Sequence, residues 1–496
     1  MNDLILPAIL LSSLLPGLII FTLPEESIRL RTTLNLAGAL VKLMFVALLF
    51  LRVVKREYSE LRLPLLADME LVLRADALSM LFLALSAFLW LLTTIYAIGY
   101  LEGSPHRSRF FGFFSLCVSA TTGIALSGDM ITFVIFYEML TISTYPLVVH
   151  RGTPAALHAG RIYLAYTLFG GVVLLLATVW LRAIVGPLDF TPGGVVAGTD
   201  PALYGSLTVI FALLILSLGV KAALVPLHSW LPTAMVAPAP VSALLHAVAV
   251  VKAGAFGIVR VVHDLYGIEF SLDLQLLFPL AVLAAVTVLY GSLRALTQND
   301  LKRRLAFSTV SQVSYILMGI ALANPLATIG GLVHLVHQGL MKITLFFCAG
   351  NLAETLDIHK VDEMDGVGKR MPWTMAAFTI GALGMIGLPP LVGFISKWYL
   401  GLGSLAADQA WVVIILILST LLNAGYFLPL LYRTWFAGTQ QEWSVSALPG
   451  GRETTWPLLA PPLITAALVI IFGLLAHLFG SPLYWVELIT AREYGL

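Results

Sequence analysis

The chain consists largely of apolar stretches of about 20 residues or more, separated by short polar segments. A hydrocarbon core of about 30 Å takes roughly 20 apolar residues as α-helix. Because every backbone group must be hydrogen-bonded internally in lipid, each stretch is predicted to be a helix. The predicted spans are residues 4–23, 34–54, 77–100, 110–127, 129–149, 160–182, 206–233, 240–263, 273–296, 305–323, 328–351, 373–405, 410–436 and 456–480. The sequence therefore predicts an all-α polytopic membrane protein with about fourteen transmembrane helices.

Composition excludes several other classes of protein. Hydrophobic residues make up 59% of the chain and charged residues 11%, against about 45–50% and about 25% in soluble domains. The net charge of +1 offers no basic surface to nucleic acid. Cys117 and Cys348 lie inside apolar stretches and are too few for an iron–sulfur cluster or a thiolate zinc site. The sequence contains no phosphate loop, cofactor fingerprint or metal-ligand spacing, so we expect no cofactor and no metal.

Basic residues in the loops predict the orientation. The loops on one side of the predicted array carry roughly twice as many Lys and Arg residues as those on the other, and the richer side is expected to face the cytoplasm. Arg31 and Arg260 are counted among these loop and span-end residues. Both termini are then predicted to lie outside the cytoplasm, in the inner (plasma) membrane of the cell. The first stretch lacks a basic leader and a cleavage site, so we expect it to be a retained helix.

Several ionisable residues remain inside the predicted spans: Glu138, Lys42, Lys221, Lys252, Lys342, Lys397, His246, His334 and His337. A charge at the bilayer centre costs about 2.5–3.5 kcal/mol on insertion scales, and a set of them usually marks an ion or proton path. Lys42 lies about eight residues into its predicted span and is expected to snorkel to the membrane surface. Structural alternatives remain open, because Glu138 with Lys221 could be a structural ion pair and His246 a core histidine bonded to a backbone carbonyl.

The chemistry of these side chains suits proton transfer. A proton moved onto or off Glu138 changes the proton affinity of a nearby Lys221, which makes the pair a switch. In the segment GGLVHLVHQGLMK, His334, Gln338 and Lys342 follow at four-residue intervals and form one stripe along a helix, with His337 about 60° to one side. The structural alternative for this stripe is a helix–helix contact held by polar side chains.

Two spans are predicted to be broken. Their sequences, SLGVKAALVPLHSWLP and GALGMIGLPPLVGFISKWYL, carry prolines in mid-span, where proline removes a backbone hydrogen bond. Interrupted spans at corresponding places in two halves point to the ion site of a transporter. Lys221 precedes its break and Lys397 follows its break, as an inverted repeat would produce. The predicted organisation is residues 1–109 as N-terminal helices, 110–264 and 265–437 as two inverted five-helix repeats, and 438–496 as the C-terminal helix.

Five motifs in order carry a resemblance. They are GDMITFVIFYEMLTIS, VKAALVPLHSWLPTAMVAPAPVSALLHAVAVVKAG, NDLKRRLAFSTVSQ, HLVHQGLMKITLFFCAGN and GLPPLVGFISKW. Over about residues 70–440 the chain resembles the antiporter-like subunits shared by respiratory complex I, membrane-bound hydrogenases and the multisubunit Mrp sodium/proton antiporters. The segments GFISKW and VSALLHAVAVVKAG are most similar to the D-type Mrp subunit.

The resemblance implies fourteen helices with two inverted five-helix repeats, other membrane subunits as partners, and a row of proton-carrying side chains. It implies that Glu138 is the charge-modulating carboxylate and Lys221 its partner. It further implies Lys252 as the central relay, His246 as an additional station, His334, His337 and Lys342 as an extension of the path, and Lys397 as the distal exchange site.

Four functions are weighed. The first is the proton-translocating subunit of a multisubunit sodium/proton antiporter, and the second is the proton-pumping membrane arm of a redox complex such as a hydrogenase or a quinone reductase. The third is the proton-conducting subunit of a CO₂ or bicarbonate uptake complex. The fourth, a non-conducting scaffold, requires the intramembrane charges to be dispensable. The residue types do not identify the exchanged cation, and the partner subunits define which of the first three applies.

Overall fold

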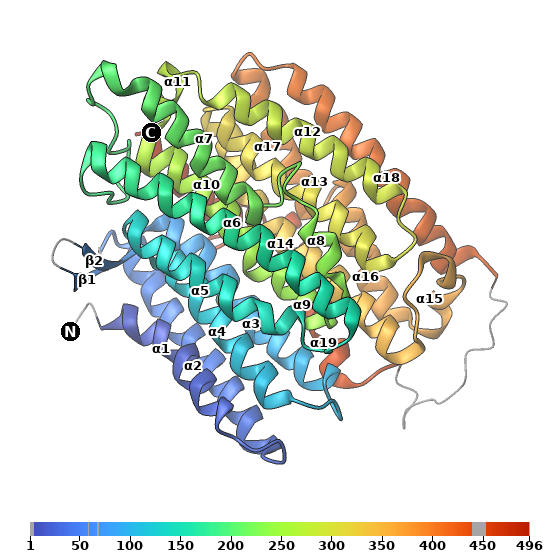
Figure 1. Ribbon diagram of the computed structural model, residues 1–496. Coiled ribbons are helices and arrows are strands. Elements are labelled where there is room, and N and C mark those ends of the chain that lie inside the picture. The colour runs from blue at the N-terminus through green and yellow to red at the C-terminus, as the bar shows by residue number, and fades with distance from the viewer. Residues whose placement is uncertain (1–3, 58, 67–68, 439–452, 496) are drawn as a thin grey trace.

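The computed structural model describes residues 4–57, 59–66, 69–438 and 453–495. Its helices run side by side in one packed array, with α1 and α2 at one edge, α12 and α18 at the opposite edge and α14 between them (Figure 1). The long helices are α1 (Ile5–Phe21), α2 (Ile28–Val54), α3 (Ala77–Tyr100), α4 (Arg107–Leu126), α5 (Met130–Val148), α6 (Pro154–Val185), α7 (Tyr204–Lys221), α12 (Leu277–Leu296), α13 (Leu301–Ala321), α14 (Pro325–Leu356), α16 (Pro372–Ile386), α17 (Val392–Ala406), α18 (Trp411–Phe436) and α19 (Trp456–Leu474).

Shorter elements complete the chain. They are the strands β1 (Ser59–Leu66) and β2 (Met69–Ala75), the helices α8 (Trp230–Thr233), α9 (Ala239–Ala243), α10 (Val250–Arg260), α11 (Ile268–Asp273), α15 (Val367–Arg370) and α20 (Pro482–Glu493), the 3₁₀ segments η1 (Pro201–Leu203), η2 (Ala234–Val236) and η5 (Val361–Glu363), and the π segments η3 (Leu244–Val248) and η4 (Val261–Tyr266).

The helical segments have the lengths that a membrane requires. Within the described ranges, 11 helices are long and apolar enough to cross a bilayer, which confirms an all-α polytopic membrane protein. Each of the fourteen predicted spans coincides with helical structure. The number of crossings, the four predicted domains and the two inverted repeats stay predictions.

Both proline-containing spans are broken, as predicted. In the first, α7 ends at Lys221 and helix resumes only at Trp230 in α8. In the second, α16 ends at Ile386 and α17 begins at Val392. Because Pro lacks an N–H donor and clashes with the preceding turn, the chain leaves the helix at each site. Lys221 therefore lies at the end of a helix, and Lys397 lies one turn inside one.

The predicted span 240–263 is confirmed as one apolar helical stretch, Ala239–Tyr266, but this stretch is irregular. It is divided into α9, η3, α10 and η4, and Ala249, between η3 and α10, has non-helical dihedrals of φ −125° and ψ −80°. The Ala249 N–H donates to Leu244 O over 2.9 Å, five residues back, which is the π-helical spacing. This break was missed because neither proline nor glycine stands at it.

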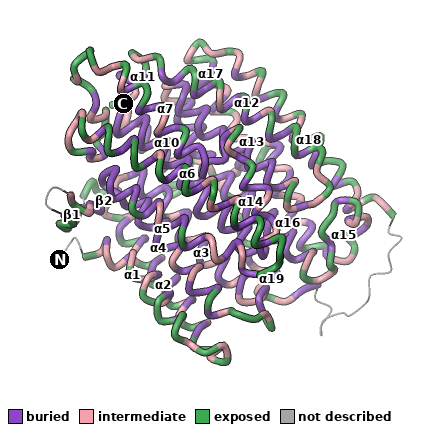
Figure 2. Tube along the Cα trace, viewed as in Figure 1, coloured by how far each residue is buried: buried purple, intermediate pink, exposed green. Residues whose placement is uncertain are grey.

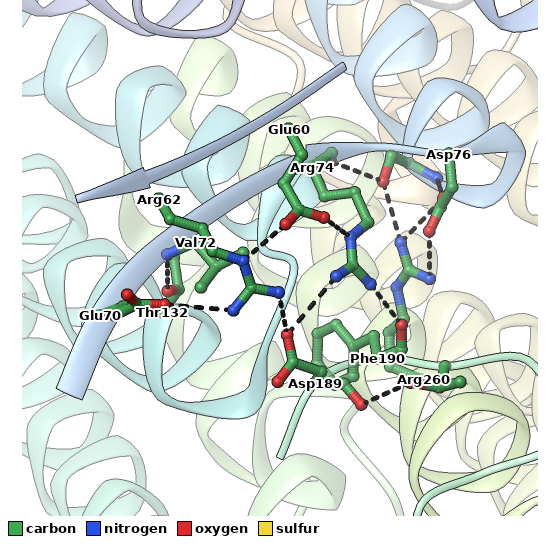
Figure 3. A network of polar contacts seen from close by, with 12 residues as sticks. Glu60, Arg62, Glu70, Val72, Arg74, Asp76, Thr132, Asp189, Phe190 and Arg260 are labelled. Atoms are coloured by element: carbon green, nitrogen blue, oxygen red, sulfur yellow. Dashed lines mark hydrogen bonds and ion pairs between the residues drawn. The ribbon is translucent and has the colours of Figure 1, made fainter. Parts of the chain in front are cut away.

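A β-hairpin replaces the loop expected after the second span. Strands β1 and β2 pair antiparallel from Ser59 with Ala75 to Leu66 with Met69, with an irregularity near Pro64. Figure 3 shows the polar network beneath it, in which Arg62 bonds Glu60 and Asp189 over 2.6 and 2.5 Å. The alternation in LRLPLL and ELVLRA is the sequence signal for these strands.

Arg260 is a buried helix residue, whereas the orientation argument from the sequence placed it among the basic residues of loops and span ends. It ends α10 with only 2% of its side chain exposed and forms an ion pair of 2.8 Å with Asp76 (Figure 3). A second ion pair of 2.8 Å joins it to Asp264. Its guanidinium also lies over the rings of Phe190 and Phe256. Two carboxylates brought together from distant parts of the chain make this burial possible.

Arg31 and Lys42 also differ from expectation, because both are buried. Arg31 donates to Ser108 Oγ over 2.8 Å between α2 and α4. Lys42 does not snorkel: it is fully buried, and its Nζ donates to Ser13 and Thr122 inside the array. The helices α1, α3 and α4 surround this part of α2 and supply those contacts, which a count of residues along one helix does not reveal.

The protein interior centres on two elements. In α14 and in the segment from Ala239 to Tyr266, every residue of the central apolar window is buried by other parts of the chain. Figure 2 shows this buried interior, with exposed residues more frequent on the outer helices. These two elements carry Lys252, His246 and the α14 stripe, so the ionisable residues lie where lipid does not reach.

Candidate functional site

Glu138 and Lys221 meet at one turn of α5. Lys221 is 1% exposed, donates from Nζ to the backbone oxygen of Tyr137 and lies 3.3 Å from the centroid of the Tyr137 ring. No ion pair of 4 Å or less joins Glu138 to Lys221 among the described side chains. The lysine is therefore held beside the carboxylate by a carbonyl and an aromatic face rather than by a direct salt bridge, so the structural ion pair is not what the structure contains.

Glycine in α6 makes room for the Glu138 carboxylate. A methyl group added at Gly171 would overlap Glu138 Oε1 and would lie 2.6 Å from Cδ and 2.7 Å from Oε2. Glu138 is half-buried, and its Oε1 is buried with no hydrogen-bond partner among the described residues. A carboxylate oxygen without a partner is free to accept a hydrogen bond from a donor such as water.

The break after Lys221 is held by neighbouring helices. The Trp230 indole N–H donates over 2.7 Å to Val220 O, one of the carbonyls left at the end of α7. The Val225 N–H donates over 3.2 Å to Thr287 Oγ1 of α12. Polar backbone groups freed by the break thus find partners inside the protein, as a membrane interior requires.

Lys252 joins the two halves of the chain. It is fully buried on α10 and donates from Nζ to Gln338 Oε1 on α14. The Gln338 Nε2 is buried and has no partner in the described part of the chain. The lysine therefore has one neutral side chain as its hydrogen-bond partner, which places the α14 stripe next to the α10 lysine.

His246 lies one element before Lys252, in η3. Its Nε2 is 3.3 Å from Met235 Sδ, and its ring stacks on Phe346 with centroids 4.5 Å apart. Its Nδ1 is buried and unpartnered in the described structure. His246 is thus a buried histidine with no backbone carbonyl partner among the described residues, and its role as a proton station stays a prediction.

The stripe on α14 contacts two other elements, α13 and α10. His334 lies against the Tyr315 ring of α13, with both ring nitrogens buried and unbonded in the described residues. Gln338 accepts from Lys252 of α10. Lys342 donates over 3.0 Å to Leu305 O and also to Ser308 Oγ, both on α13. The stripe therefore makes polar contacts between helices, and its role in a proton path stays a prediction.

His337 connects α14 with α17. Its Nδ1 is 2.9 Å from Ser396 Oγ, and its Nε2 is buried without a described partner. Ser396 immediately precedes Lys397 in the chain. The imidazole therefore lies next to the helix that carries the last lysine of the row.

Lys397 occupies the gap in the second broken helix. Its Nζ donates over 2.6 Å to Ile386 O at the end of α16 and over 2.9 Å to Thr420 Oγ1 of α18. The last carbonyls of a helix lack intrahelical partners, so the break creates the acceptor that the lysine uses. The side chain is half-buried and lines a groove of about 450 Å³ between α17 and α18 with Leu416 and Leu421.

Tertiary structure adds residues that sequence analysis did not select: Tyr137, Met235, Gln312, Tyr315, Ser396 and Thr420. Gln312 and Tyr315 are buried on α13 and have polar atoms without described partners. Their polarity inside an apolar helix is a weak signal that was available. The described residues contain no group of three or more His, Cys, Asp or Glu side chains placed to hold a metal ion.

The fold and this row of buried ionisable side chains define a class: multi-pass membrane proteins with an intramembrane path for ions or protons. Residues 127–423 match the family described as NADH:quinone oxidoreductase/Mrp antiporter, TM, and residues 66–111 match the N-terminal region of chain 5 of NADH-ubiquinone oxidoreductase (complex I). The chain belongs to the NADH:quinone oxidoreductase/Mrp antiporter membrane family.

Three relatives place the chain within this family. It is 37% identical over 407 residues to the N-type subunit of NADH-quinone oxidoreductase from Desulforudis audaxviator, covering 79% of each chain. It is 28% identical to the D-type Na⁺/H⁺ antiporter subunit of Bacillus subtilis, over 96% of this chain and 94% of the relative. A chain of the Mrp complex from a Dietzia species has the same fold, with a TM-score of 0.85, 22% identity and coverage of 99% and 97%. The resemblance predicted from the motifs is confirmed.

Proposed function

We propose that the chain is the proton-translocating subunit of a multisubunit monovalent cation/proton antiporter, with sodium as the exchanged cation and other membrane subunits as partners. The supporting observation is the buried row of amine and imidazole groups that extends from Lys221 beside Glu138 to Lys397. The antiporter relative aligns along nearly the whole chain, and the Dietzia structure is of a complex. The proposed setting is the plasma membrane, with both termini outside the cytoplasm.

Each side chain has a proposed role. Glu138 modulates the charge of Lys221, because an added or removed negative charge nearby changes the proton affinity of a buried amine. Lys252 passes protons at the centre, with His246 as an additional station. His334, His337 and Lys342 extend the path along α14, and Lys397 exchanges protons at the far end. Water bound to the unpartnered ring nitrogens and amide would bridge the stations.

Two openings suit this path. A cavity of about 520 Å³ is lined by Arg151 and Lys302, on the side predicted to face the cytoplasm, and by Met235, whose sulfur contacts His246. The second is the groove at Lys397. The first opening reaches Met235 beside His246 and the second reaches the terminal lysine, so protons could enter at one and leave at the other.

A redox complex is the second candidate, because a relative at 37% identity belongs to an NADH-quinone oxidoreductase. The same row of residues would then carry protons driven by electron transfer in other subunits. A CO₂ or bicarbonate uptake complex would use the same path. The non-conducting scaffold is disfavoured, because buried unpaired lysines are costly and a scaffold has no use for them.

Inverted vesicles that carry the whole complex provide the test. Vesicles energised with a proton gradient should release protons when sodium is added. Lys397→Ala should abolish the release while the complex assembles, and Lys360→Ala, at an exposed lysine paired with Glu363, should leave it unchanged. Proton pumping on addition of an electron donor, with no response to sodium, would show that the chain works in a redox complex instead. Transport unaffected by Lys397→Ala would overturn the proposed path.

A further inference from the structure

Lys42 is a buried amine outside the row from Glu138 to Lys397. It is fully buried near the middle of α2, and its Nζ donates over 2.7 Å to Ser13 Oγ of α1 and over 2.6 Å to Thr122 Oγ1 of α4. The same Nζ lies 5.0 Å from the centroid of the Trp90 ring of α3. Three helices therefore contribute one group each to a single amine, which is a built site rather than an accidental burial.

No carboxylate stands on α1, α2, α3 or α4, so Lys42 lacks the counter-ion that Lys221 has nearby. The titratable or charged groups of these helices are Arg29, Arg31, Arg52, Tyr96, Tyr100, Arg107, Arg109 and Cys117. The helix α20, which carries Glu487, Arg492 and Glu493, contacts α2 only further along, at Phe50 and Val53. Two hydroxyls and an aromatic face compensate the charge of this amine only in part.

A series of polar groups extends from this site toward one membrane face. Ser13 Oγ is 2.8 Å from Ser119 Oγ, and Ser119 Oγ donates over 3.0 Å to Ser115 O. Ser115 Oγ donates over 3.3 Å to Asn35 Oδ1. All four residues are buried between α1, α2 and α4, where apolar side chains would have served equally well for packing alone.

This series of polar groups ends at the solvent-exposed side chain of Glu25. Asn35 Nδ2 donates over 3.0 Å to Arg31 O, and Arg31 donates to Ser108 Oγ. The Ser108 N–H in turn donates over 3.0 Å to Glu25, whose side chain is 42% exposed. From Arg31 to Lys42 the helix rises about 16 Å, roughly half of a hydrocarbon core. Polar groups therefore reach mid-membrane from this face.

Toward the opposite face, α2 itself offers no further polar side chain beyond Lys42 until Arg52. Beyond Lys42 on the same side of α2 come Val46, Leu49 and Val53, all apolar and buried. A proton that reached Lys42 from the Glu25 end would thus return the same way. Such a dead end suits a proton-binding site that reports the pH of one compartment, and it does not suit a step in translocation across the membrane.

The helix α3 adds an independent observation. Ser86, Trp90 and Thr94 follow at four-residue intervals on α3, and the hydroxyl or indole N–H of each is buried without a hydrogen-bond partner in the described structure. Lys42 lies over the middle one. Buried polar atoms of this kind normally bond to ordered water, which would hydrate the amine and carry a proton to it.

We propose that Lys42 is a proton-binding site separate from the translocation row, loaded from the membrane face that carries Glu25. Loading would alter the hydrogen bonds of Lys42 to α1 and α4. Because α4 packs against α5, the helix of Glu138, occupancy of the site would change the transport rate. This consequence for the rate rests on the proposed proton transport, whereas proton binding at Lys42 does not.

Two measurements test the site. Hydrogen-ion titration of the purified complex compares the wild type with Lys42→Met and Lys42→Arg, whose guanidinium stays charged. Transport by the complex in proteoliposomes is then measured while the pH is changed on one side at a time. Ser13→Ala removes a hydroxyl that bonds Lys42, and Ser12→Ala is its matched control, because the Ser12 hydroxyl bonds only Ile9 O of its own helix. Complex assembly is checked by size-exclusion chromatography.

The wild-type complex should release one more proton per chain during the titration than the complex with either Lys42 variant. One component of the pH dependence of transport at the Glu25 face should be lost in both Lys42 variants. Ser13→Ala should shift the midpoint of this component by about one pH unit, and Ser12→Ala should not. A full proton count in Lys42→Met, or a wild-type pH profile in Lys42→Arg, would overturn the proposal. If neither variant assembles, equal midpoints in the two serine variants would overturn it. Titration proceeds even in a complex that transports nothing, which separates failure of this site from failure of the proposed function.

Discussion

Gly171→Ala is predicted to disable transport by displacing the Glu138 carboxylate. The added methyl group would overlap Oε1 and lie 2.6 Å from Cδ and 2.7 Å from Oε2. An ordinary contact is about 3.5 Å, so the carboxylate must move by roughly 1 Å. The end of a flexible side chain can move that far without unfolding the helix, so we expect the complex to assemble normally.

The adjacent residue gives a matched control. A methyl group at Gly170 would lie 3.2 Å from Ser217 O and from the Val220 side chain, which asks for a shift of only about 0.3 Å. Both changes gain the same helix propensity, up to about 1 kcal/mol for Ala over Gly. A displacement of 1 Å at a reacting group costs up to about 10²-fold, so we expect transport 10–100-fold slower for Gly171→Ala and within about 2-fold of wild type for Gly170→Ala.

Proton flux by the reconstituted complex, normalised to assembled complex, measures both variants. Gly171→Ala with wild-type flux would refute the role of the Glu138 position. Equal losses in both variants would show that packing of α6, rather than the carboxylate, decides the rate.

Three further predictions follow from the contacts. Lys252→Met and Gln338→Leu should each lower proton flux at least 10-fold and the double variant no further, because the two side chains form one hydrogen-bonded unit; additive losses would argue against this unit. Arg260→Met should lower the free energy of unfolding by about 3–5 kcal/mol, since it leaves two carboxylates unpaired. The exposed Arg62→Met, as a control, should lower it by less than about 1 kcal/mol. Equal melting temperatures of the two variants would contradict this prediction. Burial raises the pKa of Glu493 to about 8, helped by nearby carboxylates, so the folded state binds the proton more tightly and stability should fall as pH rises from about 4.5 to about 8. Glu493→Gln should flatten this part of the melting profile, and an unchanged slope would exclude Glu493 as its source.

The fold was largely predictable from local sequence. Apolar length predicted the helices, and the prolines near Lys221 and Lys397 predicted both broken spans, because a missing N–H acts on its own helix whatever surrounds it. The break at Ala249 has no such residue and was missed. It depends on how the segment from Ala239 to Tyr266 packs inside the array.

The candidate site was predictable in its members and not in its contacts. Intramembrane charge is visible in a sequence, so Lys221, Lys252 and Lys397 were selected correctly as buried or half-buried amines. Their partners were not visible, because Tyr137, Gln338 and the carbonyl of Ile386 come from other elements.

Lys42 shows the boundary between sequence and structure most clearly. The sequence by itself places a lysine eleven residues beyond Arg31 in an apolar helix. It also determined the helices and the two proline breaks, since hydrophobicity and proline act locally. Only the tertiary structure decided that three other helices enclose Lys42. It likewise decided that Asp76 meets Arg260, whereas Asp264 stands four residues after Arg260 in the same segment. Burial and pairing depend on which faces of distant segments pack together, and no single segment contains that information.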